Sequence, residues 1–306
     1  MSSSTLKGLF AAVLTPMRDD RSCDLDRLAA HCKALIERGC HGVSLFGTTG
    51  EGPSLSVEER KAGLDAVLAA GIAPDRILPG TGCAALTDAV ALTRHAVERG
   101  CRNTLVMPPF FFKDVPEDGV VDLYARLIDG VGSSDLRVYI YNFPAVTGVW
   151  VREDAIARLR ESYPGIVVGV KDSSGDWGYV TALLERFPGL AVFTGHETLV
   201  PRLVNAGGAG NVSGMANLVP ELLREVYDRR PPDNDPLMAG MAEMVEEVLK
   251  FPLIPAIKAV AADLSQSPEW RNVRPPLTVL DETSRNAVVE AFRKARDKTQ
   301  TGALTG

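Results

Sequence analysis

Residues 37–46 read ERGCHGVSLF and residues 98–107 read ERGCRNTLVM, so the chain twice ends a helical pattern on a glycine and continues into a short apolar run. A glycine at this position is typical of a helix end, because the left-handed backbone that closes many helices penalises a Cβ atom. Residues 205–212, NAGGAGNV, repeat the pattern. The three stretches favour a chain in which helices and buried strands alternate, although such turns also recur by chance in α/β proteins.

Apolar runs of three to six residues recur through the first two thirds of the chain, rich in Val, Ile, Leu and aromatic side chains. Such continuous runs are typical of parallel strands that are buried on both faces. The eight runs are Leu9–Leu14, Gly42–Phe46, Arg76–Pro79, Asn103–Met107, Arg137–Tyr141, Ile166–Val170, Leu190–Phe193 and Gly210–Val212. Eight strands that alternate with eight helical patterns, at about 28 residues per unit, predict a (β/α)8 TIM barrel of the α/β class. A doubly wound open sheet is the alternative, but the chain has no early G-x-G-x-x-G sequence.

The pattern changes after Tyr227, where residues 228–236 read DRRPPDNDP. A polar, proline-rich stretch of this kind is typical of a linker. Beyond it, three helical patterns without strand partners cover Leu237–Leu249, Pro255–Leu264 and Glu282–Arg296. We therefore expect a catalytic barrel domain over residues 1–230 and a C-terminal extension of three helices over residues 231–306, with a frayed tail from Lys298 onward.

Composition narrows the class of function. The chain of 306 residues has 33 Lys and Arg against 39 Asp and Glu, and a net charge of -6 offers no basic surface for nucleic acid. No apolar run approaches the roughly 18 residues that span a bilayer, and the N-terminal stretch lacks the features of a signal peptide. The cysteines and histidines have neither disulfide nor metal-ligand spacing, so we expect a cytoplasmic protein without a metal or cofactor. These residues are Cys23, Cys32, Cys40, Cys83, Cys101, His31, His41, His95 and His196.

Three motifs follow predicted strands at their C-terminal ends, where barrel enzymes place catalytic residues. The first, residues 47–52, reads GTTGEG. Three glycines and two hydroxyl groups in one turn expose backbone N–H groups that can bind a small carboxylate. The alternative is a flexible loop whose threonine caps the next helix. The loop is not predicted to bind phosphate, because no Gly-Lys-Ser/Thr sequence follows it.

The second motif is Lys171, the only lysine that closes a predicted strand. A lysine at a strand tip inside a barrel mouth is partly desolvated, which lowers its pKa and makes the neutral amine available. A neutral amine beside a carbonyl substrate forms a Schiff base. The alternative is a surface lysine paired with Asp172.

The third motif, YNFP at residues 141–144, places Tyr141 at the end of the fifth predicted strand. Its phenol can transfer protons once a neighbouring charge lowers its pKa from about 10. The alternative is a half-buried aromatic side chain that stabilises the fold. Together, a carboxylate clamp, an amine and a phenol are the parts of a Schiff-base lyase for a 2-oxo acid, in which an iminium stabilises the carbanion left when the C3–C4 bond breaks.

The motifs GTTGE, YNFP-x-x-TG and GVKD, in this order, resemble those of the dihydrodipicolinate synthase/N-acetylneuraminate lyase family of class I aldolases. The resemblance covers nearly the whole chain. It implies a TIM barrel with a helical extension, a homotetramer built as a dimer of dimers, and pyruvate as the 2-oxo acid. It also implies Lys171 as the Schiff-base residue, Tyr141 as the proton-transfer residue, Thr48 and Thr49 as ligands of the pyruvyl carboxylate, Thr48 as a link from Tyr141 to a proton relay, and Gly195 and Val212 as lining of the pyruvyl pocket.

Two departures from the family pattern bear on the substrate. Typical dihydrodipicolinate synthases have an arginine for the second substrate's carboxylate where this chain has Val146. Valine cannot replace that bidentate contact. Those synthases also lend a relay tyrosine across a dimer interface, whereas residues 107–113 here read MPPFFFK, without a hydroxyl group. Protons must therefore leave Tyr141 through Thr48, water or substrate.

We accordingly expect a class I pyruvate-dependent aldolase or lyase for a 4-hydroxy-2-oxo acid, such as a 2-keto-3-deoxy sugar acid. His196 and Glu197 are candidate ligands for substrate hydroxyl groups, or else a capped helix start. One alternative is dihydrodipicolinate (4-hydroxy-tetrahydrodipicolinate) synthase, which condenses pyruvate with aspartate semialdehyde. The others are a dehydratase or decarboxylating lyase that uses the same imine, and a non-catalytic 2-oxo acid sensor.

Overall fold

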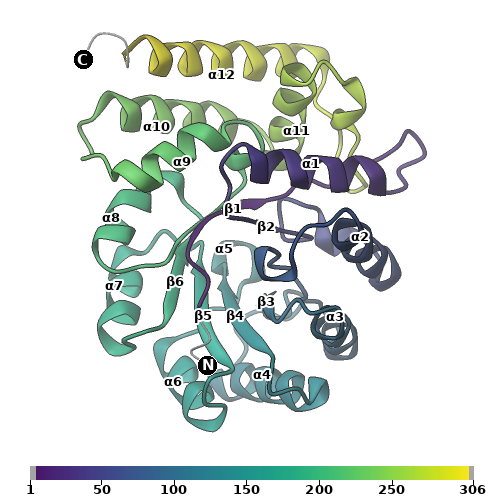
Figure 1. Cartoon of the computed structure of the whole chain (residues 1–306), viewed down its shortest axis with the longest axis vertical. Coiled ribbons are helices and arrows are strands. Elements are labelled where there is room, and N and C mark those ends of the chain that lie inside the picture. The colour runs from purple at the N-terminus through teal and green to yellow at the C-terminus, as the bar shows by residue number, and fades with distance from the viewer. Residues whose placement is uncertain (1–4, 303–306) are drawn as a thin grey trace.

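Seven parallel strands form the centre of the computed structural model, which describes residues 5–302 (Figure 1). They are hydrogen-bonded in the order β2-β1-β7-β6-β5-β4-β3, so their C-terminal ends meet at one rim. The strands are β1 (Gly8–Ala12), β2 (Gly42–Ser44), β3 (Asn103–Val106), β4 (Arg137–Asn142), β5 (Val167–Asp172), β6 (Ala191–Thr194) and β7 (Gly210–Ser213).

Residues 77–80 close the barrel between β2 and β3, where the sequence predicted a regular strand. The backbone N–H groups of Leu78 and Gly80 donate to carbonyl oxygens in and just after β2, at 2.8 and 2.7 Å. On the other side, Leu105 of β3 donates to the carbonyl of Pro79 at 2.9 Å. Only isolated parallel bridges form, because Pro79 has no N–H group to continue a ladder. The barrel is confirmed, whereas the prediction of eight regular strands is wrong by one.

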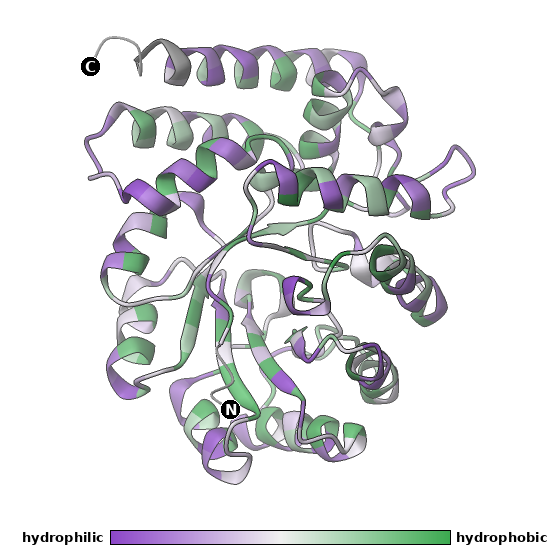
Figure 2. Ribbon diagram, in the orientation of Figure 1, coloured by the Kyte–Doolittle hydropathy of each residue, from purple (hydrophilic) through white to green (hydrophobic). Residues whose placement is uncertain are grey.

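Helices surround the strands and turn their apolar stripes, green in Figure 2, toward them. In α1, for example, Leu28, Cys32 and Leu35 recur at helical spacing and are buried, and the Asp24 carboxylate caps the first turn. The helices of the barrel are α1 (Leu25–Glu37), α2 (Val57–Ala69), α3 (Leu86–Glu98), α4 (Glu117–Val131), α5 (Pro144–Thr147), α6 (Glu153–Ser162), α7 (Trp177–Arg186), α8 (Val200–Asn205) and α9 (Pro220–Arg229). Short 3-10 turns are η1 (Gly52–Ser54), η2 (Pro74–Arg76), η3 (Glu197–Leu199) and η4 (Met215–Asn217).

Aromatic side chains fill the barrel interior below the rim. Tyr139 on β4 packs edge-on against Phe193 on β6, which packs in the same way against Phe10 on β1. Gly169 on β5 leaves room for this layer, because a Cβ atom there would lie 2.3 Å from the Tyr139 ring. The interior is therefore packed rather than hollow, and a ligand can enter only above this layer.

Beyond the barrel lie α10 (Pro236–Leu249), α11 (Leu253–Leu264), η5 (Pro268–Arg271) and α12 (Glu282–Gly302). Met241, Met244 and Phe292 of these helices belong to the same buried cluster as Leu14 and Val43 of the barrel. The extension thus shares a core with the barrel. The sequence predicted a frayed tail from Lys298 onward. This prediction is wrong for residues 298–302, which belong to α12, and residues 303–306 lie outside the described part of the chain.

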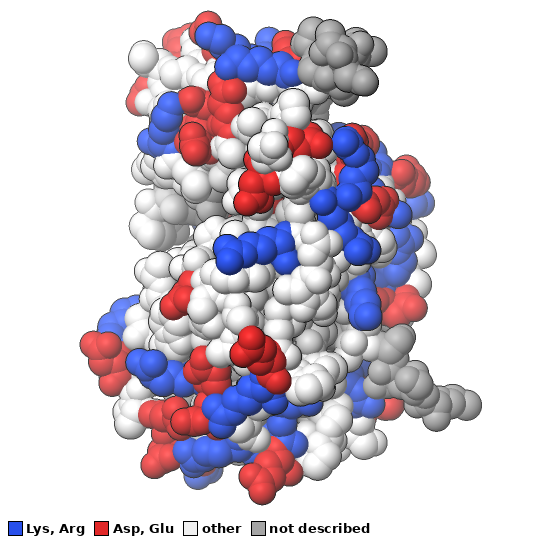
Figure 3. All heavy atoms as spheres, turned by 90° about the vertical axis from the view of Figure 1, so that its left-hand side faces the viewer, with Lys and Arg blue, Asp and Glu red and all other residues white. Residues whose placement is uncertain are grey.

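Lys and Arg side chains are interspersed with Asp and Glu over the face seen in Figure 3. Among residues 5–302, no helix is both long and apolar enough to cross a membrane.

His31 on α1 makes the stability of the fold depend on pH. Its ring packs against Trp270 of η5, and its Nε2 lies 3.0 Å from the Asn217 side-chain oxygen. Burial lowers the pKa of His31 from 6.5 to about 4. Between about pH 4 and pH 6.5, His31 binds a proton in the unfolded chain but not in the folded protein. We therefore expect the contribution of His31 to stability to be fully present above about pH 6.5 and to fall toward pH 4, by about 3 kcal/mol.

We expect His31→Gln to remove this part of the pH dependence, because the amide can still donate to Asn217 but does not titrate. Urea unfolding at several pH values between 4 and 7 measures the slope for both proteins. Equal slopes in the wild type and in His31→Gln would mean that other groups cause the acid destabilisation.

Candidate active site

A cavity of about 170 Å³ opens at the C-terminal rim of the barrel. It brings together eight of the nine residues that the sequence predicted for the site. They are Thr48, Thr49, Tyr141, Lys171, Gly195, His196, Glu197 and Val212, which come from β4, β5 and β7 and from the segments after β2 and β6. Their roles stay predictions.

Lys171 lies near the end of β5 and is only 6% exposed. Its Nζ lies 4.3 Å from the centre of the Tyr141 ring, and none of the ion pairs among the described residues involves it. The neighbouring Asp172 instead accepts hydrogen bonds from Asn142 Nδ2 (2.8 Å) and from Ser174, and burial raises the pKa of its carboxyl group. The alternative of a surface lysine paired with Asp172 is therefore wrong.

Tyr141 stands beside Lys171 because these two residues are aligned in the β4–β5 ladder. Its ring is 4% exposed and stacks on Phe143, which also lines the cavity. The Tyr141 hydroxyl lies 3.5 Å from Thr48 Oγ1, at the outer limit of a hydrogen bond. An amine, a phenol and a hydroxyl thus lie in sequence along one wall.

Residues 47–52 are held from two sides. Thr15 Oγ1 donates to the carbonyl of Gly50 at 2.6 Å, which fixes the loop against the end of β1. Glu51, which has a left-handed backbone (φ 55°), points its carboxylate at the extension, where it pairs with Lys258 Nζ and accepts from Arg274 N–H at 3.0 Å. The Glu51 and Lys258 side chains are both fully buried. The extension therefore anchors the loop that carries Thr48 and Thr49.

The segment after β6 has little free space. A Cβ atom on Gly195 would lie 2.2 Å from Ser173 Oγ, so any larger residue there would force the Ser173 side chain to move. Glu197 is 7% exposed and accepts a hydrogen bond from Ser213 Oγ at 2.5 Å, whereas His196 is exposed. His196 and Glu197 both reach the cavity, and Glu197 retains one carboxylate oxygen for a ligand.

Val146 is the one predicted site residue that the cavity lining does not include. It lies on α5 and is 45% exposed. The nearby loop carries Phe111 and Phe112, which pack edge-on against each other and are 76% and 71% exposed. Most of the surface of these two aromatic residues is therefore left uncovered by the described residues of the chain.

The sequence did not predict that the extension forms a wall of the cavity. This wall consists of Val245, Val248 and Leu249 from the end of α10 and Leu253 and Ile257 from α11. Helical periodicity predicts that such a helix has an apolar face but does not say what that face covers. Lys258 did carry a signal, since it is the only charged residue between Leu253 and Ala262.

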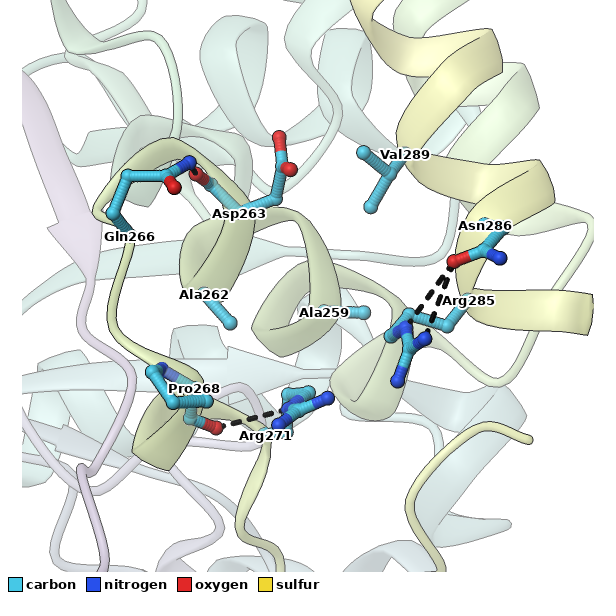
Figure 4. Close-up of a pocket in the computed structure, with 9 residues that line it drawn as sticks. All are labelled: Ala259, Ala262, Asp263, Gln266, Pro268, Arg271, Arg285, Asn286 and Val289. Atoms are coloured by element: carbon cyan, nitrogen blue, oxygen red, sulfur yellow. Dashed lines mark hydrogen bonds between the residues drawn. The ribbon is translucent and has the colours of Figure 1, made fainter. Parts of the chain in front are cut away.

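A second hollow of about 270 Å³ lies within the extension, between α11, η5 and α12 (Figure 4). Arg271 and Arg285 point into it, and the lining contains none of the residues predicted for the site. Among the residues that the structure describes, no group of three or more His, Cys, Asp and Glu side chains is arranged to hold a metal ion.

Comparisons with known proteins agree with this geometry. The model of the dihydrodipicolinate synthetase family matches residues 5–295. The chain is 36% identical over 299 residues to an uncharacterized DapA-like lyase of Chloroflexus aurantiacus, which covers 97% of this chain and 98% of the relative. The dihydrodipicolinate synthase from Agrobacterium tumefaciens is 37% identical with a TM-score of 0.88, over 94% of this chain and 99% of that one. The KD(P)GA from T. tenax is 27% identical with a TM-score of 0.81, over 95% and 99%.

These matches cover the barrel together with its extension. The chain therefore belongs to the dihydrodipicolinate synthetase family and is an enzyme of the aldolase and lyase type that this family comprises.

Proposed function

We propose that this enzyme joins pyruvate to an aldehyde, or cleaves the resulting 4-hydroxy-2-oxo acid, through an imine on Lys171. The observation that carries the proposal is the buried Lys171 amine, 4.3 Å from the Tyr141 ring at the carboxylate-binding rim. Lys171 has no carboxylate partner among the ion pairs of the described residues, so its amine is free to attack a ketone carbon. No cofactor is needed, because the imine itself accepts the electrons of the breaking bond.

The reaction balances with the groups present. The Lys171 amine attacks C2 of pyruvate, and water leaves to form the imine. A water molecule takes a proton from C3 of the imine, which gives an enamine whose C3 forms the new bond to the aldehyde carbon. The aldehyde oxygen takes a proton from the Tyr141 hydroxyl, and Tyr141 recovers a proton from that water through Thr48. A second water molecule then hydrolyses the imine and frees the Lys171 amine. In the cleavage direction each step runs backward.

Thr48 and Thr49 are suited to the pyruvyl carboxylate, because they present hydroxyl groups in a turn rich in glycine N–H donors. Thr48 is also within 3.5 Å of the Tyr141 hydroxyl, so it can pass a proton between Tyr141 and water. Gly195 and Val212 shape the space around the methyl and keto groups of pyruvate.

The synthase reaction with aspartate semialdehyde is the second candidate, favoured by the name of the Agrobacterium relative. The cavity lining argues against it, because Lys171 is the only Lys or Arg among the described residues that line it. The carboxylate of aspartate semialdehyde would then lack a cationic partner.

We also propose that the protein is a homotetramer built as a dimer of dimers and works in the cytoplasm. Exposed aromatic pairs such as Phe111 and Phe112 are typical of surfaces that another subunit covers. All five cysteines are unpaired, as expected in a reducing compartment.

Borohydride reduction in the presence of pyruvate tests the proposed function. The expected product is a peptide with Lys171 whose mass has increased by pyruvate less one oxygen atom. The same treatment without pyruvate should leave the peptide unchanged. An unmodified Lys171 under conditions that label a control aldolase would refute the imine.

A further inference from the structure

The cavity has two chemically different ends. One part of the lining is polar and contains the Lys171 amine, several hydroxyl groups and the Glu197 carboxylate. These groups can serve the 2-oxo acid and the new C4 hydroxyl. The wall from α10 and α11 contributes only aliphatic side chains to the lining. Because pyruvate uses the polar groups, this wall is left for the part of the substrate that the aldehyde supplies.

The position of the wall is fixed by the same helix that anchors the carboxylate-binding loop. Ile257 Cδ1 and Thr49 Oγ1 both lie 3.3 Å from the point that a Cβ atom on Gly214 would occupy, so the aliphatic wall begins directly beside the threonine loop. The next residue, Lys258, is buried in its ion pair with Glu51. α11 therefore cannot withdraw Ile257 from the cavity without breaking that pair.

At the mouth of the cavity, Leu249 and Leu253 are 59% and 37% exposed although both line it. Covering these two water-exposed leucines with an apolar group would stabilise the complex. A hydroxylated chain at the same place would instead lose hydrogen bonds to water. Phe143, stacked on Tyr141, adds an aromatic surface to the lining.

The charges of the cavity lining disfavour an anionic group beside Leu249 and Leu253. Lys171 is consumed by the imine, and the described lining holds no other Lys or Arg. Glu197, also in the lining and 7% exposed, would repel a second carboxylate.

We propose that the aldehyde used by this enzyme carries a short, uncharged, apolar chain, which lies against Leu249, Leu253 and Val245. This inference rests on the proposed function and narrows it, since it replaces the sugar-derived aldehyde predicted from the sequence with an aliphatic one. Leu249 and Leu253 are then residues that determine specificity, without a part in the bond-making steps.

Three small aldehydes separate the possibilities in the synthesis direction with pyruvate. Butanal is apolar, glyceraldehyde is hydroxylated, and aspartate semialdehyde is charged. We expect kcat/KM for butanal to exceed that for each of the others by about tenfold or more, as is usual for a pocket that discriminates by apolar contact. Equal or better turnover of glyceraldehyde or aspartate semialdehyde would overturn the inference.

Variants at the mouth test the assignment to these leucines. Leu249→Asn and Leu253→Asn should each lower kcat/KM for butanal several-fold and reduce its advantage over glyceraldehyde, while the rate of pyruvate trapping by borohydride stays unchanged. Val279→Asn is the matched control, because Val279 is 48% exposed and lies outside this cavity. Unchanged butanal kinetics in both leucine variants would refute their role.

Borohydride trapping distinguishes failure of the substrate inference from failure of the proposed function. If pyruvate labels Lys171 but butanal is not preferred, the substrate inference fails and the proposed function stands. If pyruvate does not label Lys171, both fail.

Discussion

Lys171→Met is expected to reduce turnover to the background rate, a loss of at least about 10⁴-fold, because no other group can form the imine on which every later step depends. Methionine keeps the length and apolar character of the side chain, so the packing against Tyr141 changes little. Steady-state turnover of pyruvate with an aldehyde measures the loss, and borohydride trapping should fail in parallel.

Two further variants show whether the loss is specific. Lys33→Met makes the same change on the exposed face of α1 and should leave turnover unchanged. Tyr141→Phe keeps the amine, so it should still trap pyruvate while turnover falls by about 10²-fold for want of a proton donor. If Lys171→Met retained turnover within tenfold of the wild type, the imine mechanism would be wrong.

The polar end of the active site could be predicted from the sequence because barrel geometry fixes where strands end. Once the apolar run 166–170 is assigned to a strand, Lys171 must lie at the rim, and the same rule places Tyr141 and Thr48 beside it. The parallel ladder then aligns Tyr141 with Lys171. These placements need only local pattern and one topological rule.

The apolar end could not be predicted in this way. The helices after residue 230 have no strand partners, so nothing in their periodicity says which part of the barrel they cover. Leu249 and Leu253 acquire their role only through the packing of α10 and α11. The third barrel segment was mispredicted for a local reason, since the apolar run 76–79 contains a proline that interrupts the ladder.

The ion pair between Lys258 and Glu51 shows how far the barrel depends on its extension. Both side chains are fully buried, and each has a further partner: Lys258 Nζ donates to the carbonyl of Asn272 at 2.6 Å, and Glu51 accepts from Arg274 N–H. Burial lowers the pKa of Lys258, while the Glu51 carboxylate opposes that change. The two charges are therefore tolerated only as a pair.

Lys258→Met is expected to lower the free energy of unfolding by about 3–5 kcal/mol, because it leaves the Glu51 carboxylate buried without a cation. Urea unfolding measures this loss, and Lys294→Met, on the exposed face of α12, should change stability by less than about 0.5 kcal/mol. Adding Glu51→Gln to Lys258→Met should restore most of the stability, since the amide is neutral and can still accept from Arg274.

The same variants connect stability with binding. Glu51 lies two residues from Thr49, so loss of the pair should loosen residues 47–52, for which we propose carboxylate binding. We therefore expect KM for pyruvate to rise several-fold in Lys258→Met, even below the temperature at which it unfolds. If Lys258 had only a structural role, Lys258→Met would lower the free energy of unfolding and leave KM for pyruvate unchanged in the folded fraction. A rise in KM that persists in the stabilised double variant would show that Lys258 positions the loop through its charge and not only through packing.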